Sequence, residues 1–251
     1  MSELAQLPLA FWVVAPLTLV FAYTVFGMSG FGSTVIAVPI LAIWLPPTVV
    51  IPLMTLGDLV AAVTVGTAGR RQVSVPELKR IMPFMVVGIV AGVAALVTVP
   101  QEPLKVALAL FTLAVGVHSI LNPSPKGTIS PWWCIPAGST AGFCASVFGA
   151  GGPINVAYLA GRLRDKGEIR STVSTIISIS ATLRTTLYAL AGLALKPVVL
   201  LGFAAGIPFA WLGLRLGSRI HTGFTNEQMR RAVGGILLAS GTVLLARTLA
   251  A

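Results

Sequence analysis

The sequence has few charged residues for its length. Asp, Glu, Lys and Arg make up 10% of its 251 residues, whereas 56% are hydrophobic. Soluble domains usually carry about 25% charged residues. Apolar runs of roughly 15 to 22 residues recur along the chain with hardly a charge inside them. The composition therefore excludes a soluble globular core and indicates an all-α polytopic membrane protein.

Acidic residues are the scarcer of the two signs. Seven Asp and Glu residues stand against 17 Lys and Arg, which gives a net charge of +10. The basic residues fall in short connections between apolar runs, as the positive-inside rule expects of cytoplasmic loops, so we expect no nucleic-acid partner. The sequence also lacks H-E-x-x-H, G-x-S-x-G and P-loop motifs. These absences argue against an enzyme, and we assign no catalytic residue.

Cysteine and histidine are nearly absent as well. The two cysteines, Cys134 and Cys144, fall in one expected helix, where they would lie about 15 Å apart, too far for a disulfide. The two histidines, His118 and His221, are distant from them in the sequence. We therefore expect no disulfide, no metal site and no cofactor.

Long apolar segments are what the sequence has in abundance. We expect ten, five in residues 1–121 and five in 132–251, with 122–131 as a cytoplasmic linker. The start of the chain has no basic residue, unlike a cleaved signal peptide, so the first segment is expected to remain as a helix. The segments lie at about 8–26, 31–45, 48–66, 80–98 and 104–121, then 132–148, 152–163, 170–192, 197–216 and 228–248.

The positions of the basic residues orient these segments. Lys and Arg cluster after the third, seventh and ninth segments, and Lys126 lies in the linker. If every segment crosses, these connections share the cytoplasmic side and both termini face outward. An odd number of crossings per half then makes the halves inverted repeats, which is typical of transporters that bind substrate near the midplane.

Two glycine-rich stretches interrupt the apolar runs in the same way. Aligning Phe26 with Phe148 places Gly27 on Gly149 and Ser33 on Asn155. Glycine and proline favour the start or end of a helix, and polar backbone inside a bilayer must face a cavity, because lipid would leave it unsatisfied. The stretches are Phe26-Gly27-Met28-Ser29-Gly30-Phe31-Gly32-Ser33-Thr34 and Gly149-Ala150-Gly151-Gly152-Pro153-Ile154-Asn155.

The length of the seventh segment leaves two topologies open. About 12 residues make a helix of roughly 18 Å, short of the ~30 Å hydrocarbon core. Segments six and seven therefore either both cross or form a re-entrant hairpin with its tip at 149–153, and segments one and two form the mirror image. Charge counting does not separate the two, since the parity of the loops is the same. Both place the glycine breaks near the midplane.

These motifs resemble those of the TauE/SafE sulfite exporter family. The likeness rests on Gly27 to Ser33, on Pro39 and Pro46-Pro47, and on Gly149 to Ile154 followed by a basic loop and a Ser/Thr-rich helix. The resemblance implies a permease of the bacterial inner membrane. It implies a cargo of sulfite, an organosulfonate or a related sulfur-containing or carboxylate anion, moved as an exporter by an ion gradient and not by ATP.

Arg184 is the sharpest single clue to the site. It lies in the middle of an apolar segment, where an unpaired charge costs about 2.5 to 3.5 kcal/mol on insertion scales. Its planar guanidinium suits the oxygens of sulfite, sulfonate or carboxylate, and Ser180 is close enough in sequence to add a hydroxyl donor. The alternatives are a structural arginine paired with Asp58 or with backbone carbonyls, and a side chain that snorkels outward.

Asp58 is the other charge within an apolar segment. Its segment is the repeat partner of the one that holds Arg184, so the two could meet across a pseudo-twofold axis. A carboxylate there could carry a proton or organise another coupling ion. The alternative is that Asp58 does no more than neutralise Arg184.

Polar residues at the two breaks complete the expected anion site. Ser29, Ser33, Thr34 and Asn155 are expected to cap helix N-termini, and the amides around Gly30, Gly151 and Gly152 could bind an anion there. The alternative is close helix packing by small residues. Together these features predict a secondary-active transporter that works by alternating access. A passive anion channel is the closer alternative, and an intramembrane enzyme is the weaker one.

Overall fold

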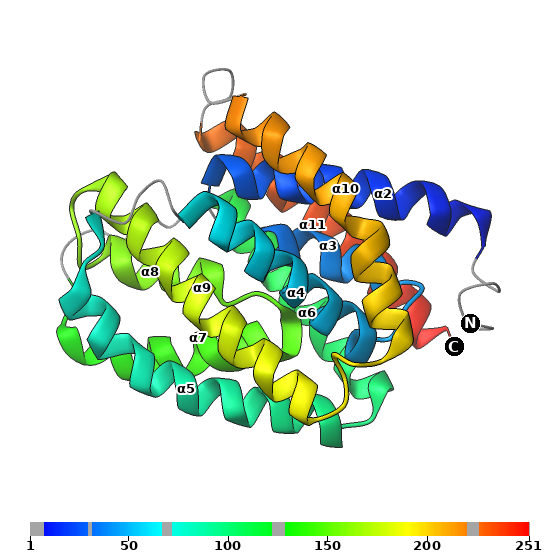
Figure 1. The fold of residues 1–251 in the computed structure, drawn as a ribbon, viewed down its shortest axis with the longest axis horizontal. Helices are drawn as coiled ribbons and strands as arrows, with labels where there is room; N and C mark the ends of the chain where they lie inside the picture. The colour runs from blue at the N-terminus through cyan, green and yellow to red at the C-terminus, as the bar shows by residue number, and fades with distance from the viewer. Residues whose placement is uncertain (1–7, 30–31, 67–71, 122–128, 220–225, 251) are drawn as a thin grey trace.

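The computed structural model describes residues 8–29, 32–66, 72–121, 129–219 and 226–250, and its regular structure in these ranges is helical throughout (Figure 1). The first half contains α2 Leu9–Ser29, α3 Ser33–Leu41, α4 Pro47–Gly66, α5 Val75–Thr98 and α6 Gln101–Leu121. The second half contains a short 3₁₀ helix, η2 Pro131–Trp133, followed by α7 Cys134–Phe148, α8 Gly152–Ala160, α9 Lys166–Leu190, α10 Pro197–Arg219 and α11 Asn226–Leu249.

Each of the ten expected segments contains a helix, but α5 and α9 begin before their apolar runs, whereas α3 and α8 are shorter than theirs. The apolar run of the fourth segment begins at residue 80, whereas α5 begins at Val75 with Pro76 in its first turn, a position that tolerates proline. Helix α9 begins at Lys166, four residues early, because the Asp165 carboxylate accepts a hydrogen bond from the Glu168 amide and caps the helix. Apolar runs therefore locate the helices, and caps set their ends.

Helices α3 and α8 are too short to cross a bilayer. Each has nine residues, about 14 Å at 1.5 Å per residue, against a hydrocarbon core of ~30 Å. Within the described ranges six helices are long and apolar enough to cross: α2, α5, α6, α9, α10 and α11. Of the two topologies that the sequence left open, crossing by every segment does not fit the lengths of α3 and α8, and the chain is a multi-pass membrane protein with two short internal helices.

Glycine lies at a helix boundary in both breaks, as expected from the sequence. Gly32 precedes α3 with a φ of 99°, and Gly149 follows α7 with a φ of 70°. Both values lie in the left-handed region, which side chains other than glycine rarely adopt. The backbone can therefore turn at Gly32, where α3 begins, and at Gly149, between α7 and α8.

The most extensively packed helix pairs join the two halves of the chain. Helix α2 packs along α10 and α7 packs along α5, while α6 packs along α11 and α4 along α9 near the centre (Figure 1). Glycines allow the close approach of α5 and α7: a Cβ on Gly88 would overlap the Ser139 carbonyl, and one on Gly142 would overlap the Met85 carbonyl. Small residues thus bring these backbones together, as they do in membrane helix pairs generally.

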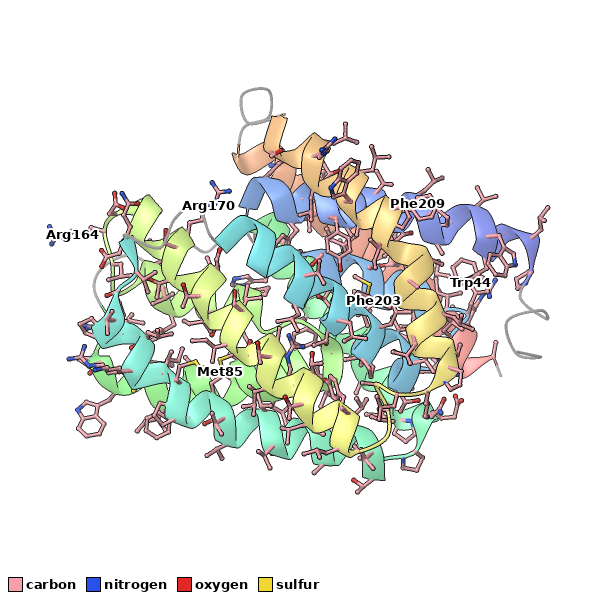
Figure 2. All side chains as sticks on the ribbon, viewed as in Figure 1. Trp44, Met85, Arg164, Arg170, Phe203 and Phe209 are labelled. Carbon is pink, nitrogen blue, oxygen red and sulfur yellow. The ribbon has the colours of Figure 1, made fainter. Side chains whose placement is uncertain are left out.

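Arg164 and Trp44 lie at opposite ends of the long axis. Figure 2 shows Arg164 at the end of the molecule where α8 leads into α9, and Trp44 at the other end, just after α3. Short helices α3 and α8 lie between these two ends and are held within the bundle of longer helices.

Candidate functional site

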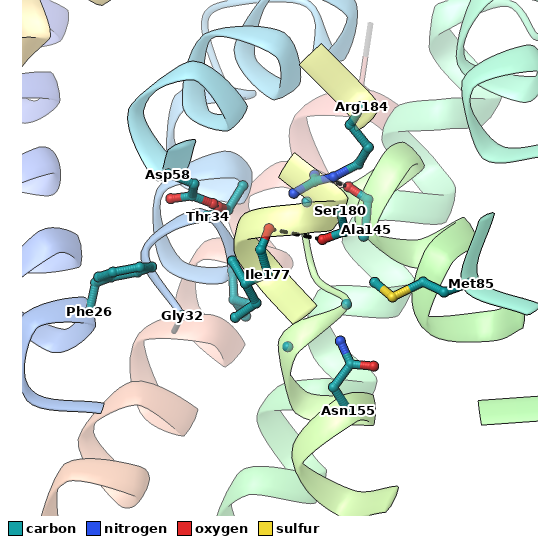
Figure 3. Close-up of a pocket in the computed structure, with 14 residues that line it drawn as sticks. Phe26, Gly32, Thr34, Asp58, Met85, Ala145, Asn155, Ile177, Ser180 and Arg184 are labelled. Carbon is teal, nitrogen blue, oxygen red and sulfur yellow. Dashed lines mark hydrogen bonds between the residues drawn. The ribbon is translucent and has the colours of Figure 1, made fainter. Parts of the chain in front are cut away.

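A small cavity lies where the two helix breaks meet. Gly149 touches α3 so closely that a Cβ on Gly149 would overlap the Thr34 side chain. The space open to the centre of a water-sized sphere is about 20 Å³, roughly room for one or two waters. Residues from several helices and both breaks line it: Phe26, Gly32, Thr34, Val35, Asp58, Met85, Ala145, Gly149, Gly151, Gly152, Asn155, Ile177, Ser180 and Arg184 (Figure 3).

Arg184 reaches the cavity from α9 and is 3% exposed. Its Nη1 donates to the Ala145 carbonyl at 2.6 Å and to the Thr55 hydroxyl at 3.3 Å. Its Nε is buried and has no hydrogen-bond partner among the described residues. The snorkelling alternative is excluded by this burial. The pairing with a backbone carbonyl is present, but it leaves the buried Nε without a partner among the described residues.

Asp58 lies on the opposite side of the cavity, on α4, and is 5% exposed. The Ser33 hydroxyl donates to its Oδ1 and the Thr34 hydroxyl to its Oδ2. Asp58 lies within electrostatic range of Arg184, but the guanidinium bonds neutral oxygens instead. The two charges therefore face one cavity without forming a direct ion pair.

Ser33 and Thr34 do not cap α3, contrary to the expectation from sequence. The N-cap residue of α3 is Gly32, and no side chain caps it. The first residues of α3 instead turn their hydroxyls toward the carboxylate of α4, which is a stronger acceptor than a neutral group. These hydroxyls do face inward, but their partner is the nearby aspartate and not the end of their own helix.

The prediction that Asn155 caps a helix N-terminus is also wrong. It is the fourth residue of α8, whose N-cap is Gly151 without a side-chain hydrogen bond. Its side chain is 0% exposed, lines the cavity (Figure 3), and neither its amide nitrogen nor its oxygen has a partner among the described residues. A buried polar group left unpaired costs about 1 to 3 kcal/mol, so this amide is suited to a polar ligand.

The remaining residues expected at the site divide into three groups. Gly151, Gly152 and Ser180 line the cavity, although the Ser180 hydroxyl donates to the Ile177 carbonyl at 3.0 Å. Ser29 is the last residue of α2, and its side chain lies outside the described residues. Gly30 lies outside the described residues.

Two supporting residues were missed from the sequence. Thr55 accepts a hydrogen bond from Arg184, and the buried Tyr188 donates its hydroxyl to the Ser146 carbonyl at 2.7 Å. Helical spacing could have found both, because Thr55 precedes Asp58 by three residues and Tyr188 follows Arg184 by four, which puts each pair on one helix face. Tyr188 thereby fixes the turn of α7 that presents Ala145 to Arg184.

Comparison with known proteins agrees with this architecture. The model of the family described as sulfite exporter TauE/SafE matches residues 15–244. The chain belongs to the sulfite exporter TauE/SafE family. It is also 28% identical over 193 residues to the "Probable inner membrane transporter protein TsaS" of Comamonas testosteroni, a match that covers 76% of this chain and 81% of the relative. No solved structure matches it.

Membership of the TauE/SafE family decides between two of the alternatives. Members of this family are transporters and not enzymes, so this chain is a multi-pass membrane transporter and the intramembrane enzyme is set aside. The cavity between the two breaks is then the place to look for its cargo, because transporters of this kind bind at discontinuous helices.

Proposed function

We propose that this TauE/SafE transporter moves sulfite, an organosulfonate or a related small anion across the bacterial inner membrane, with export as its direction. One observation carries the proposal: the Nε of Arg184 and the amide of Asn155 are buried and unpartnered among the described residues, and both side chains line one small cavity. An oxyanion would accept from both donors, and a guanidinium suits such oxygens. The name of the Comamonas relative supports the inner membrane as the location.

The proposed mechanism is alternating access between two inverted repeats, 1–121 and 132–251. The exchange of packing partners supports the repeats, because α2 pairs with α10 as α7 pairs with α5. Each half would then contribute one short helix, α3 or α8, whose first turn meets the cargo. The basic connection after α8 supports a cytoplasmic location for that end, for the linker 122–131 and, by parity, a periplasmic location for both termini.

Coupling is assigned to Asp58. It is the acidic side chain among the described residues that line the cavity, and it sits across from the cationic Arg184. A carboxylate in this place can take up and release a proton as the site opens to either side. Asp58→Asn is then expected to leave flux that no longer responds to a pH gradient.

Uptake into proteoliposomes tests the function. Purified protein would be offered radiolabelled sulfite and a labelled organosulfonate under an imposed proton gradient. Arg184→Ala should reduce flux at least about a hundredfold, because it removes the charge and the free donor, a loss of about 3 kcal/mol. Arg164→Ala is the matched control, since this arginine is exposed in the connection between α8 and α9 and should leave flux unchanged.

Each other result has a definite meaning. Flux that ignores the gradient in the wild type would favour a passive anion channel, the remaining alternative. Equal flux in Arg184→Ala and wild type, with both proteins inserted and monodisperse in detergent, would remove Arg184 from the site and contradict the proposal.

A further inference from the structure

The charges that line the cavity are one cation and one anion. Among the described lining residues these are Arg184 and Asp58, and both are nearly fully buried. Arg184 is hydrogen-bonded to Ala145 and Thr55, which are neutral acceptors. The two lining charges therefore balance, yet the hydrogen bonds of the guanidinium within the described chain go to neutral groups and not to the carboxylate.

The groups that face Asp58 from neighbouring helices are mostly hydroxyls. Ser33 and Thr34 of α3 donate to it, and the Tyr23 hydroxyl of α2 is a third hydrogen-bonding neighbour. Arg184 of α9 is the charged group in range. Among the described residues of these helices, no second carboxylate faces Asp58.

The described parts of the other helices packed against α4 bring no titratable group to Asp58. Helix α10 contributes apolar side chains and glycine to the groove beside Gly57, with Trp211 the most polar of them, and α7 brings Ala145 to the cavity. On α6, Glu102 pairs with Lys105 at 3.2 Å and His118 is exposed. A proton that enters with the cargo therefore has Asp58 as its acceptor within this described region.

Cargo changes the charge balance of the site. A singly charged anion beside Arg184 leaves the cavity with one net negative charge, and a proton on Asp58 restores neutrality. A doubly charged anion leaves one negative charge even after that proton has bound. Buried net charge is strongly disfavoured where few polar groups compensate it.

We propose that the site loads one singly charged oxyanion together with one proton on Asp58, so that the cargo is electrically neutral. This inference rests on the proposed function and names its substrate class and stoichiometry. An anion at Arg184 strengthens proton binding at Asp58, and by linkage the proton strengthens anion binding equally. Positive coupling of this kind gives cotransport of anion and proton, and not exchange of one for the other.

The direction of net movement then follows the gradients of anion and proton. A neutral cargo is indifferent to the membrane potential. Export of an accumulated anion is opposed only by the pH gradient. One pH unit balances an anion concentration ratio of about ten, so half a unit balances a ratio of about three. Export therefore proceeds whenever the anion is more than modestly concentrated in the cytoplasm.

Methanesulfonate and sulfate provide a matched pair of probes. They have nearly the same tetrahedral shape and differ by one charge, because a methyl group replaces one oxygen. In proteoliposomes of wild-type protein, methanesulfonate should enter at least about tenfold faster than sulfate, because the doubly charged anion leaves a buried net charge. With the outside more acidic by one unit it should accumulate up to about tenfold. A potassium diffusion potential at equal pH should drive no accumulation of methanesulfonate.

Asp58→Asn should convert neutral transport into charge-carrying transport. Methanesulfonate flux should lose its response to the pH gradient and gain a response to a potential that is positive inside, because the anion then moves alone. Glu102→Gln, which removes an exposed carboxylate at the start of α6, should behave as wild type. If Asp58→Asn does not fold, the wild-type response to potential decides the question by itself.

Three wild-type results would overturn the inference: flux driven by the potential, sulfate transported as fast as methanesulfonate, or methanesulfonate expelled toward the acidic side. Failure of the proposed function looks different. In that case Arg184→Ala would retain wild-type flux of methanesulfonate in the same vesicles, whatever its dependence on pH or potential.

Discussion

Helices α3 and α8 both have nine residues and both begin beside the cavity, but different forces anchor their far ends. In α3 eight of the nine residues are buried, whereas in α8 only Asn155, Tyr158 and Leu159 are. Burial of apolar side chains therefore holds α3 along its whole length. Helix α8 is held mainly at its ends, which makes it the better candidate for the moving part.

A buried carboxylate secures the far end of α8. Glu77, at the start of α5, accepts from the Tyr158 hydroxyl at 2.6 Å, from Arg162 at 2.9 Å and from Arg80 at 2.7 Å. Arg162 also donates to the Ile129 carbonyl at 2.9 Å. Its hydrogen bonds to Glu77 raise the pKa of Arg162, so this network stays charged. In the proposed alternating-access mechanism, water would replace these bonds when α8 opens.

The far end of α3 has aromatic neighbours in place of carboxylates. Trp44, just beyond α3, packs edge-on against Phe11 with ring centroids 6.1 Å apart, and Arg247 of α11 lies over its ring at 5.8 Å. Water does not substitute for these contacts. Under the proposed alternating access, we expect the α8 side to open by exchanging hydrogen bonds with water and the α3 side to open by moving a packed apolar unit.

Glu77→Ala is expected to lower stability more than any other single change at either short helix. It leaves Tyr158, Arg80 and Arg162 without their shared acceptor, and breaking a buried pair costs about 3 to 5 kcal/mol. The free energy of unfolding would be measured by a denaturant titration in mixed micelles. Glu102→Ala is the control, because its pair with Lys105 is exposed and worth about 0 to 1 kcal/mol. Equal losses in the two variants would contradict an ionic anchor for α8.

Gly149→Ala is expected to be the next most damaging change, because Gly149 is where the two breaks touch. Its φ is 70°, and a Cβ there would overlap the Thr34 side chain that donates to Asp58. Left-handed strain costs about 1 to 2 kcal/mol, and overpacking adds about 1 to 3 kcal/mol.

Gly192→Ala isolates the strain from the overlap. Gly192 has a φ of 71° and open space where a Cβ would go, so this variant should lose about 1 to 2 kcal/mol from strain alone. Transport should fall in Gly149→Ala and persist in Gly192→Ala. If the two variants were equally stable and equally active, the contact between the breaks would have no role.

Asn155→Leu is expected to separate binding from stability. The substitution replaces an unpaired buried amide with an apolar side chain of similar volume, so the free energy of unfolding should stay level or rise by about 1 kcal/mol. Half-saturation for a transported anion should rise about 10- to 100-fold, which corresponds to about 1 to 3 kcal/mol. Ser33→Ala on α3 should do the opposite and lower stability, because it takes a donor from Asp58. Lower stability in Asn155→Leu would identify Asn155 as a structural residue.

The sequence was sufficient for the helices and for the charged centre of the site. Glycine and proline located both breaks, and Arg184 and Asp58 stood out because charge is rare inside apolar segments. The hydrogen-bond partners were not predictable, since they depend on how helices rotate against one another. Ala145 offers only a backbone carbonyl, which no residue type signals. The capping roles of Ser33 and Asn155 were wrong for the same reason: where these side chains point is decided by the packing of neighbouring helices and not by the ends of their own.

The Glu77 network at the far end of α8 could not be predicted from the sequence either. Glu77 and Arg162 are 85 residues apart in the chain, and no pattern in the sequence pairs them. Only the packing of α5 against the second half brings Glu77 under α8 and buries it. Charge counting orients the connections between helices in the membrane, but it does not tell which of their charges pair.

Arg247→Gln is expected to have the smallest effect, and it tests whether the α3 end depends on charge at all. Arg247 is exposed on α11, and a cation over an aromatic ring at such a site is worth about 0.5 to 1 kcal/mol. Glutamine keeps part of the side chain over Trp44 and removes the charge. If the α3 end is held by apolar burial, unfolding should shift by less than about 1 kcal/mol and transport should stay unchanged. A loss as large as that of Glu77→Ala would mean that both short helices are anchored electrostatically, and the contrast between them would disappear.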